Sequence, residues 1–361
     1  MKIILITLLL LTVAPAARAQ NYVYQVGMKT RLFSDEKRTD WSGGAPRPLL
    51  TMIWYPAEED VIEREITIGA PDKPLFLSGR AARDVKISSG KKHYPLVVLS
   101  HGTGGAALQM MWLGEYLARR GFIVAAANHH GNTGAEDKLT AQGSRLWWER
   151  SRDLSVTIDR MLADDEFGKL IDKDKIGIAG FSLGGTTVIS VAGGVFNPDA
   201  LAKFCASPKR DATCGATPEN PTAEEDLKKI IDTDAVVIAS IKRAKDSYLD
   251  KRVKAVFAVA PALGYAFDRL DSIKIPVEIV VGAKDTSSPP ATNAVLFDRR
   301  LKNSKLTILP GEVSHYVFLS ECGSAGIETL PQICLDAKTV NRAAVHREVG
   351  EMAFKFFQKN L

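Results

Sequence analysis

One serine of this sequence lies in a motif that could carry nucleophilic chemistry. Ser182 is the middle residue of Gly180-Phe-Ser-Leu-Gly184, which follows the strand-like run KIGIA and precedes the helical run GTTVISVA. A GxSxG motif between a strand and a helix predicts a sharp turn that raises the serine hydroxyl above the sheet. Glycines suit the flanking positions because a Cβ there would meet the crowded backbone, and the following helix N-terminus favours developing negative charge. We therefore interpret Ser182 as a nucleophile.

A serine hydroxyl needs a nearby base, itself oriented by a carboxylate, to attack at neutral pH. The chain has six histidines, and the chain order serine, acid, histidine leaves only His315 and His346 as the base. His315 follows the run KLTILP in the short loop GEVSHYVF, so we expect it at the edge of the sheet. His346 falls in a helical pattern with charged neighbours, and we expect a solvated side chain there.

The predicted acid is Asp285. It comes directly after an apolar run in VEIVVGAKD and before the loop TSSPP, which is where this chain order requires a carboxylate. An aspartate that only forms a turn is the alternative interpretation. Asp271 is a weaker candidate because it precedes its strand.

The oxyanion of a tetrahedral intermediate needs two preorganised N–H donors. We expect one from the backbone amide of Leu183, directly after the nucleophile. The other is expected from the glycine-rich loop His101-Gly-Thr-Gly-Gly105, with Thr103 as the donor. Glycines allow that backbone to approach a substrate closely. Taken alone, the loop could be only a tight turn between a strand and a helix.

Three further histidines are candidates for contact with a substrate. His129 and His130 end an apolar run, and His101 opens the glycine-rich loop, so all three fall at the expected catalytic edge. We predict that they contribute to the substrate pocket. Hydrogen bonds that shape the loop, made with Asn128 and Asn132, are an equally good interpretation of the His129-His130 pair.

These residues must be positioned by a sheet, and the hydrophobic pattern predicts one. Short, continuously apolar runs are typical of strands buried on both faces of a parallel sheet. Their alternation with helical patterns implies right-handed crossovers, so the expected fold class is α/β, a mostly parallel central sheet flanked by helices. The predicted strands are 95–100, 122–127, 175–179, 253–259, 275–281 and 305–309, and the predicted helices include 106–120, 154–162 and 340–357.

Two segments depart from this alternation. Residues 22–57 favour antiparallel strands at the edge of the sheet, and a polar segment follows to about Lys92. Residues 195–252 intervene between a helix and a strand and contain two amphipathic helical patterns, 223–231 and 236–248. Because insertions of this size often lie over the carboxyl ends of the strands, where ligands bind, we predict a helical cap. A surface decoration remote from the site is the alternative.

The N-terminus has the pattern of a cleavable export signal. Lys2 precedes an apolar run at residues 3–13, and Ala17-Arg-Ala19 fits the small-x-small pattern that signal peptidases cut. We predict a signal peptide at residues 1–19 and a periplasmic or secreted protein. The run is too short to span a bilayer, so an uncleaved membrane anchor is the minor alternative and no stable membrane insertion is expected.

Residues 20–361 are predicted to form one catalytic domain that carries the cap at about 195–252.

The charge of the chain excludes one class of partner. The formal net charge of +5 falls to +3 when Lys2 and Arg18 leave with the leader. This small excess is spread along the chain, without the clustered basic patch that nucleic-acid-binding proteins use. Nucleic acid is therefore not an expected partner, and nothing in the sequence indicates an oligomeric state.

The four cysteines form two local pairs along the chain. Cys205 lies near Cys214, and Cys322 lies near Cys334. An exported chain meets an oxidising compartment, so we predict two disulfides that brace loops. A metal site is the alternative, but the CxxC spacing and the nearby histidine ligands that zinc prefers are missing. We expect no metal and no cofactor.

Several motifs in order give the chain a family resemblance. SHGTGG, NHHGNTG, GFSLGG, VVGAKD and SHY resemble the bacterial proteins labelled predicted dienelactone hydrolases, which are similar to plasma-type platelet-activating-factor acetylhydrolases. The resemblance covers most of the mature chain. It implies the α/β-hydrolase fold and a Ser-Asp-His esterase that needs neither cofactor nor calcium.

The chain departs from both groups at one position each. True dienelactone hydrolases use a cysteine nucleophile, where this chain has Ser182. The platelet-activating-factor enzymes place their acid after the strand that follows the elbow, and that strand here reads AVFAVAPALG, without a carboxylate. Asp285 is therefore assigned the role of the acid.

The predicted function is that of an exported serine hydrolase acting on a small-molecule carboxylic ester. An acyl-enzyme would form on Ser182, with His315 and Asp285 as base and acid. A peptidase or amidase on the same scaffold, a platelet-activating-factor-type phospholipid acetylhydrolase and a catalytically silent binding protein are the alternatives. A peptidase would need a subsite for an amine or a carboxylate, and no pattern indicates one. The complete set of catalytic residue types argues against a silent protein.

Overall fold

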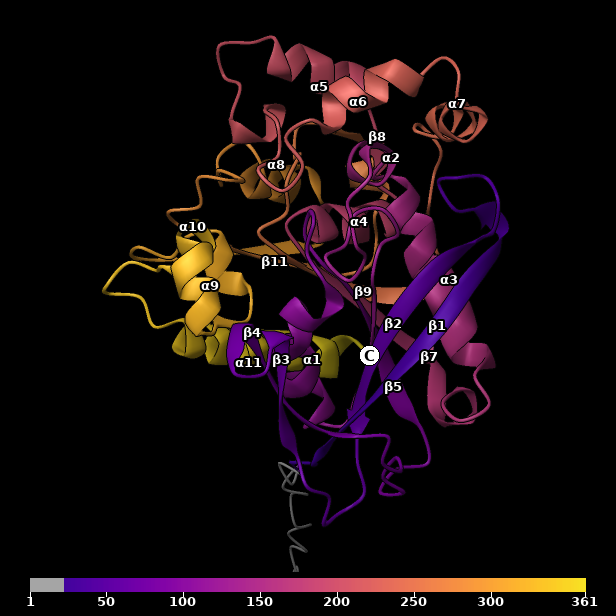
Figure 1. The fold of residues 1–361 in the computed structure, drawn as a ribbon, viewed down its shortest axis with the longest axis vertical. Coiled ribbons are helices and arrows are strands. Elements are labelled where there is room, and N and C mark those ends of the chain that lie inside the picture. Colours follow the sequence, from indigo (N-terminus) through magenta and orange to yellow (C-terminus); the bar gives the residue numbers. More distant parts are fainter. Residues whose placement is uncertain (1–22) are drawn as a thin grey trace, which may run out of the picture.

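A long mixed β-sheet forms the centre of the structure (Figure 1). The computed structural model describes residues 23–361, so the predicted signal peptide lies outside the described residues. The strands of this sheet are β1 (Val26–Thr39), β2 (Pro46–Pro56), β3 (Arg64–Ala70), β4 (Lys73–Arg83), β5 (Tyr94–Ser100), β6 (Ile123–Ala127), β7 (Ile171–Phe181), β9 (Val253–Val259), β11 (Val277–Gly282), β12 (Ser304–Leu309) and β13 (Glu321–Cys322). Their order is β12-β11-β9-β7-β5-β6-β2-β1-β4-β13, with β3 paired to β4.

The parallel half of the sheet runs from β6 to β12, where every neighbouring pair is parallel. β6 and β11 are buried at every residue, and β9 at every residue except Lys254. Helices cover both faces of these strands, so only continuously apolar sequence is compatible with their position. The expected α/β class, with a mostly parallel sheet flanked by helices, is confirmed.

The other half of the sheet contains the antiparallel pairs. β1 and β2 form the hairpin expected for residues 22–57, and β2 pairs antiparallel with β6. β3 and β4 form a second hairpin that the sequence did not predict. Much of it is exposed or only half-buried, so few of its positions need to be apolar and the strand pattern is weak.

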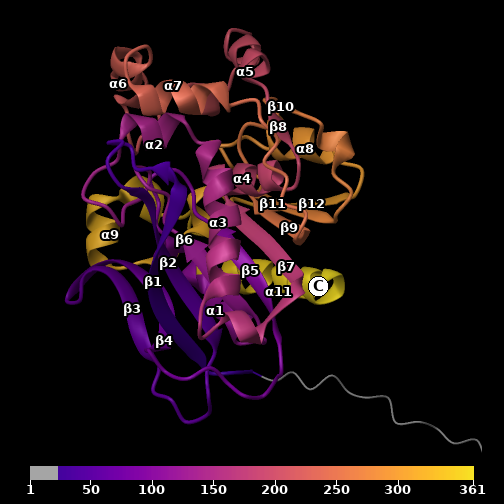
Figure 2. The same ribbon diagram turned by 90° about the vertical axis from the view of Figure 1, so that its right-hand side faces the viewer.

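Helices pack on both faces of the parallel strands (Figure 2). On one face α1 (Met111–Ala118) packs against α11 (Arg342–Asn360), and on the other α3 (Glu149–Ala163) packs against α4 (Leu183–Val191). Beyond these lie α2 (Ala141–Arg145), α8 (Ala294–Arg300), α9 (Ser324–Thr329) and α10 (Pro331–Cys334). The short 3-10 helices are η1 (Ala107–Met110), η2 (Gly168–Leu170), η3 (Ala212–Cys214), η4 (Leu270–Ser272) and η5 (Tyr316–Phe318).

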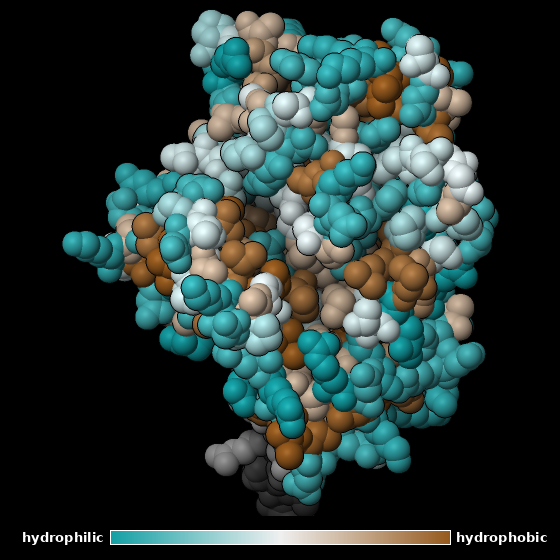
Figure 3. Space-filling view, in the orientation of Figure 1, coloured by the Kyte–Doolittle hydropathy of each residue, from teal (hydrophilic) through white to brown (hydrophobic). Residues whose placement is uncertain are grey.

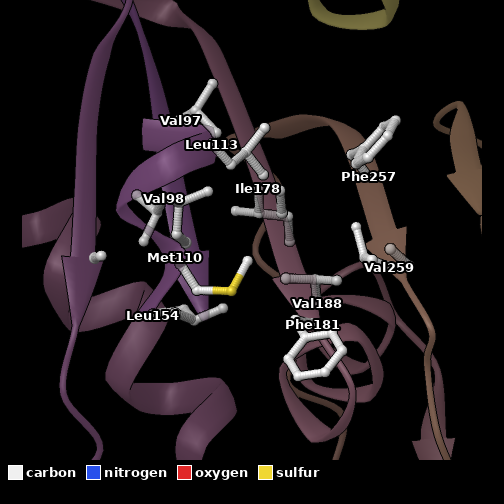
Figure 4. Close-up of a cluster of buried hydrophobic side chains, with 14 of the residues drawn as sticks. Val97, Val98, Met110, Leu113, Leu154, Ile178, Phe181, Val188, Phe257 and Val259 are labelled. Carbon is white, nitrogen blue, oxygen red and sulfur yellow. The ribbon is translucent and has the colours of Figure 1, made fainter. Parts of the chain in front are cut away.

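The core lies where these helices meet the sheet. Neighbouring residues of β5 point to opposite sides, so Val97 lies beside Leu113 of α1 while Val98 faces the side that holds Leu154 of α3 (Figure 4). All four side chains are fully buried. Apolar burial of this extent fixes the strand ends, and therefore the loops that carry the polar residues described below.

Residues 195–252 form a helical layer at one end of the molecule. They contain β8 (Val195–Phe196), α5 (Pro198–Cys205), α6 (Ala223–Ile230) and α7 (Ala235–Lys242), and β8 pairs with β10 (Phe267–Asp268). Figures 1 and 2 show the three helices on the side of α2, α4 and α8, beyond the carboxyl ends of the parallel strands. The indole Nε1–H of Trp148 donates to the Ser240 carbonyl at 3.0 Å and thereby links α7 to the N-terminus of α3.

Two disulfides brace surface segments, as expected from the cysteine pairs. Cys205 is bonded to Cys214 within the 195–252 segment, and Cys322 is bonded to Cys334 between β13 and α10. Within residues 23–361, no helix combines the length and the apolar character needed to cross a membrane.

One face of the molecule is predominantly hydrophilic (Figure 3). Apolar side chains on this face gather around the hollow beside the α9–α10 region. Polar side chains cover most of the α5–α7 layer in the same view.

Candidate active site

Ser182 occupies a strained turn between β7 and α4. Its backbone has φ 55° and ψ −120°, a conformation that residues with a side chain rarely adopt. The Ser182 amide donates to the Val259 carbonyl at the end of β9, at 2.9 Å. This hydrogen bond ties the turn to the neighbouring strand, so the strain is sustained by the sheet.

Glycines on both sides make the turn possible. A Cβ on Gly180 would collide with the Gly184 carbonyl, and a Cβ on Gly184 would collide with the Ser100 carbonyl of β5. Both neighbours are backbone atoms that cannot move aside. The flanking glycines of the motif are therefore required by steric exclusion, as the sequence pattern predicted.

The structure brings three of the predicted residues into one chain of hydrogen bonds. His315 Nε2 lies 3.0 Å from Ser182 Oγ, and His315 Nδ1 lies 2.7 Å from Asp285 Oδ2. The amide of Ser288 donates to the other oxygen of Asp285 at 2.7 Å. Asp285 follows β11, and His315 precedes η5 after β12, so each side chain comes from a loop at the carboxyl end of a strand.

Burial and packing hold the base in place. His315 and Asp285 are buried, with 4% and 3% of their surface exposed, whereas Ser182 is partly exposed. The ring of Phe181 packs on the His315 ring with 4.8 Å between centroids. Asp285 accepts a hydrogen bond from Nδ1–H, which leaves Nε2 as the acceptor for the serine hydroxyl. The arrangement can remove the Ser182 proton as the hydroxyl attacks an electrophile.

The two predicted oxyanion donors lie beside this serine. A Cβ on Gly102 would be 3.3 Å from Ser182 Cβ, so the glycine-rich loop passes directly against the nucleophile. In the described part of the chain, neither the Thr103 amide nor the Leu183 amide donates to a protein group. Both amides are therefore free to donate to a bound oxyanion.

The three histidines predicted for the substrate pocket are placed differently from one another. His129 is fully buried, and its ring lies 2.8 Å from Ser100 Oγ and 2.9 Å from Asp153 Oδ2. His101 is buried beneath the glycine-rich loop, and only His130 is partly exposed, at 2.8 Å from Glu136 Oε1. Contact of His101 and His129 with a substrate finds no support in this geometry, because their ring nitrogens already face protein groups.

Burial also sets the ionisation of these rings. It lowers the pKa of His129 to about 3 and, reinforced by the positive charge of Arg150, lowers the pKa of His101 well below its usual value. Both rings are therefore neutral near pH 7. A neutral imidazole has one donor and one acceptor nitrogen, which fixes the direction of its hydrogen bonds.

His346 is buried, which corrects the expectation of a solvated side chain. Its ring stacks on Trp112 with 4.3 Å between centroids, and Nε2 donates to the Val317 carbonyl at 2.9 Å. Burial lowers its pKa to about 4. The charged neighbours along the sequence lie on the other side of α11, so they gave no indication of which face His346 occupies.

Two residues near the site were not found from the sequence. Glu219, in the 195–252 segment, lies against the loop, since a Cβ on Gly104 would be 2.7 Å from Glu219 Cβ. The hydroxyl of Tyr316, next to the base, donates to Glu219 Oε1 at 3.5 Å. Arg150 of α3 donates to carbonyls of the same loop. Glu219 and Arg150 approach the site from distant parts of the chain, and neither lies in a local sequence motif.

The mostly parallel sheet and the turn at Ser182 have the arrangement of the α/β-hydrolase fold. The prolyl oligopeptidase family matches residues 108–200, which include the serine turn. A ferulic acid esterase from Streptomyces cinnamoneus superposes with a TM-score of 0.62 over 96% of this chain and 92% of its own, at 19% sequence identity. This likeness confirms the expected α/β-hydrolase fold.

Sequence relatives agree with the resemblance derived from the motifs. Platelet-activating factor acetylhydrolases from Cavia porcellus and Bos taurus are 29% and 27% identical over 184 and 202 residues, which is 38% of this chain in each case and 42% and 45% of theirs. Lipase 1 of a Moraxella species is 29% identical over 113 residues, 28% of this chain and 32% of its own. The chain spans less than half the length of these curated relatives.

Proposed function

We propose that the chain is a serine hydrolase that cleaves carboxylic esters. The observation that carries the proposal is the contact series from Ser182 through His315 to Asp285, with distances of 3.0 Å and 2.7 Å, beside two free backbone amides. A nucleophile, a base, an orienting carboxylate and oxyanion donors are the parts that acyl transfer requires.

Acylation begins when Ser182 Oγ attacks the ester carbonyl carbon. The hydroxyl proton passes to His315 Nε2, and Asp285 stabilises the resulting imidazolium through Nδ1–H. The carbonyl oxygen becomes an oxyanion that accepts hydrogen bonds from the Thr103 and Leu183 amides. When the tetrahedral intermediate collapses, the bond to the leaving oxygen breaks, and that oxygen takes the proton from Nε2 and departs as an alcohol.

Deacylation repeats these steps with water as the nucleophile. His315 Nε2 removes a proton from water, whose oxygen attacks the acyl-enzyme carbonyl. When the second tetrahedral intermediate collapses, the bond to Ser182 Oγ breaks, that oxygen takes the proton from His315 Nε2, and a carboxylic acid is released.

A chromogenic ester assay tests this function. The wild-type protein should hydrolyse p-nitrophenyl acetate and butyrate and should be labelled by a fluorophosphonate, whereas Ser182→Ala should lose about 10⁴-fold or more in kcat and all labelling. A chain-length series of esters would then define the acyl preference. Neither turnover nor labelling of the folded wild-type protein would contradict the proposal.

Two alternatives draw on named relatives. The matches to platelet-activating factor acetylhydrolases favour an acetylated phospholipid of the platelet-activating-factor type as substrate. The match to the prolyl oligopeptidase family favours amide cleavage. An sn-2 acetyl phospholipid and a peptide p-nitroanilide, assayed beside the simple esters, separate the three, because the preferred class should give the highest kcat/KM.

Export is part of the proposal. The pattern at residues 1–19 and the two disulfides both suit a periplasmic or secreted protein, since such bonds persist in oxidising compartments. The N-terminal sequence of protein recovered from the periplasm or the medium should begin near Gln20. A chain that retains residues 1–19 there would contradict cleavage.

A further inference from the structure

Arg150 is a charged side chain buried without a counter-ion in contact. Only 1% of its surface is exposed. Within residues 23–361 its guanidinium forms no ion pair with a carboxylate, and its Nε and Nη1 atoms have no hydrogen-bond partner, although the charge of Asp153 acts on it from beyond contact distance. Burial lowers the pKa of Arg150 to about 9, which leaves it charged at neutral pH. Burying such a charge is costly, so its position calls for a functional explanation.

The one bonded nitrogen of Arg150 is directed at the glycine-rich loop. Nη2 donates to the His101 carbonyl at 2.9 Å and to the Gly102 carbonyl at 3.1 Å. These two hydrogen bonds use both protons of that nitrogen, so the 3.1 Å approach of Nη2 to His101 Nδ1 is a contact without a hydrogen bond. A charged donor makes them stronger than bonds from a neutral group.

His101 supplies a second donor to the same carbonyl. Its Nε2 accepts a hydrogen bond from the His129 amide at 3.2 Å. The ring proton of the neutral imidazole is therefore on Nδ1. Nδ1–H donates to the Gly102 carbonyl at 2.7 Å. The Gly102 oxygen thus accepts from both an imidazole and a guanidinium, with a longer contact from the Gly105 amide at 3.3 Å.

The Gly102 carbonyl belongs to the same peptide unit as the Thr103 amide. Hydrogen bonds on the oxygen of a peptide draw electron density from its nitrogen, so they strengthen the N–H as a donor and fix its direction. That N–H is the donor assigned to the oxyanion, and it donates to no protein group in the described chain. The positive charge of Arg150 therefore lies directly behind the peptide that would meet the developing negative charge.

We propose that Arg150, acting with the neutral His101 ring, is a positioning residue for the oxyanion hole: it orients and polarises the Gly102–Thr103 peptide. This inference rests on the proposed ester hydrolysis. It assigns His101 a role behind the loop instead of in the substrate pocket. Because the interaction matters most when the oxyanion forms, Arg150 acts on kcat and leaves KM nearly unchanged.

Arg150→Met separates positioning from structural support. Methionine fills much of the same volume without a charge, so removal of an unpaired buried charge should leave the melting temperature unchanged or raised. We expect kcat for p-nitrophenyl acetate to fall about 10- to 100-fold, less than on deletion of a direct oxyanion donor. Affinity for a boronic acid, which forms a tetrahedral adduct on the serine, should fall by a similar factor.

Two further variants control the comparison. Arg150→Lys keeps the charge but loses the paired donation, and its kcat should lie between those of the wild-type protein and Arg150→Met. Arg38→Met removes another buried arginine, one that pairs with Asp35 and Asp153 and does not touch the loop. It should lose stability while the protein that remains folded keeps a kcat within about threefold of the wild type.

The outcomes distinguish the inference from the function on which it rests. An active wild-type protein with an unchanged kcat in Arg150→Met would overturn the positioning role alone. A loss of melting temperature in step with activity, or a raised KM with an intact kcat, would also overturn it. If Arg150→Met does not fold, Arg150→Lys decides by the same split of kcat and KM. A wild-type protein without turnover or labelling would instead refute ester hydrolysis itself.

Discussion

At the scale of single residues, the site depends on one unfavourable backbone conformation. Ser182 has a positive φ although it carries a side chain, and such strain persists only where surrounding structure over-determines it. The hydrogen bond to Val259 and the steric limits at Gly180 and Gly184 supply that constraint. The hydroxyl consequently points toward His315 before any substrate arrives, so little ordering remains for the attack itself.

Glu219 gives a prediction about pH. Burial raises the pKa of its carboxyl group above the usual value, because the charged form is poorly solvated between the loop and Tyr316. The group therefore favours the folded state below its unfolded pKa and loses that contribution as pH rises through its folded pKa. Glu219→Gln cannot ionise, so it should exceed the wild-type free energy of unfolding at pH 8 and match it near pH 4.

Urea unfolding at the two pH values measures this difference. Glu225→Gln on α6 is the matched control, since Glu225 is exposed and should show no such pH-dependent gain. A Glu219→Gln protein that is less stable than the wild type at pH 8 would contradict the argument. That result would mean that the ionised carboxylate is stabilised in the fold.

At the scale of elements, the segment after His315 is held by covalent and polar ties. η5 leads into β13 and α10, which the Cys322–Cys334 bond joins. Arg342 of α11 donates to the Ser320 carbonyl at 3.1 Å and to the Ile333 carbonyl at 2.7 Å. The loop of His315 therefore precedes a braced region, which limits its movement away from Ser182.

Loss of the Cys322–Cys334 bond should reduce stability and activity together. The bond closes a loop with a sequence separation of 12, and a loop of that size corresponds to about 3 kcal/mol of stabilisation. We expect Cys322→Ser/Cys334→Ser to unfold at lower urea concentration and to show a reduced kcat/KM at temperatures where it is still folded. Cys205→Ser/Cys214→Ser, which removes the bond in the 195–252 segment, is the comparison. An unchanged kcat/KM in the first variant would show that the brace does not reach the base.

At the scale of the whole molecule, one buried ionic network joins three regions of the chain. Asp153 of α3 bonds to Arg38 of β1 at 2.6 Å and to Arg47 of β2 at 2.8 Å. Glu149, one turn earlier, pairs with Arg243 after α7 at 2.6 Å. The β1–β2 hairpin and the 195–252 segment are thus both connected to α3.

Asp153→Asn tests how much this network contributes to the free energy of unfolding. Burial opposes ionisation of Asp153, but the charges of Arg47 and Arg38 outweigh it and hold the pKa well below its usual range. A depressed pKa contributes stability that is present above the unfolded value and lost as pH falls. The variant should therefore lose about 3–5 kcal/mol in the free energy of unfolding at pH 7, because buried Arg47 loses its carboxylate partner and buried Arg38 loses one of its carboxylate partners, and less at pH 3.

The same substitution on the exposed face of α3 provides the control. Asp159 pairs with Arg252, and 59% of its side chain is exposed, so Asp159→Asn should cost no more than about 1 kcal/mol. Equal losses at the two positions in urea unfolding would show that burial adds nothing to the ion pairs. A loss at position 153 that does not shrink toward pH 3 would contradict the assigned pKa direction.

The central sheet was predictable because its strands are buried on both faces. The run predicted at 253–259 coincides with β9, and the GxSxG motif lies between β7 and α4, where its steric requirements apply. The β3–β4 hairpin escaped prediction because a half-exposed edge needs no apolar run. The burial of His346 escaped it because helical periodicity alone did not identify the buried face of α11.

Residues that act across long sequence distances could not be assigned from the sequence. Arg150 precedes the serine by more than 30 positions and contacts a loop almost 50 positions before itself, so no spacing rule connects them. Glu219 reaches the site from a segment whose placement depends on tertiary contacts such as that between Trp148 and Ser240. Only the tertiary structure reveals these contacts.

The 195–252 segment leaves the sheet after α4 and returns at β9 as one uninterrupted stretch. The proposed nucleophile, base and acid all lie outside that stretch, on loops that follow β7, β12 and β11. Recombination could therefore exchange the whole stretch at two junctions without altering the reacting groups. A scaffold divided in this way is suited to diversification, because the exchanged stretch and the loops at the strand ends can change independently.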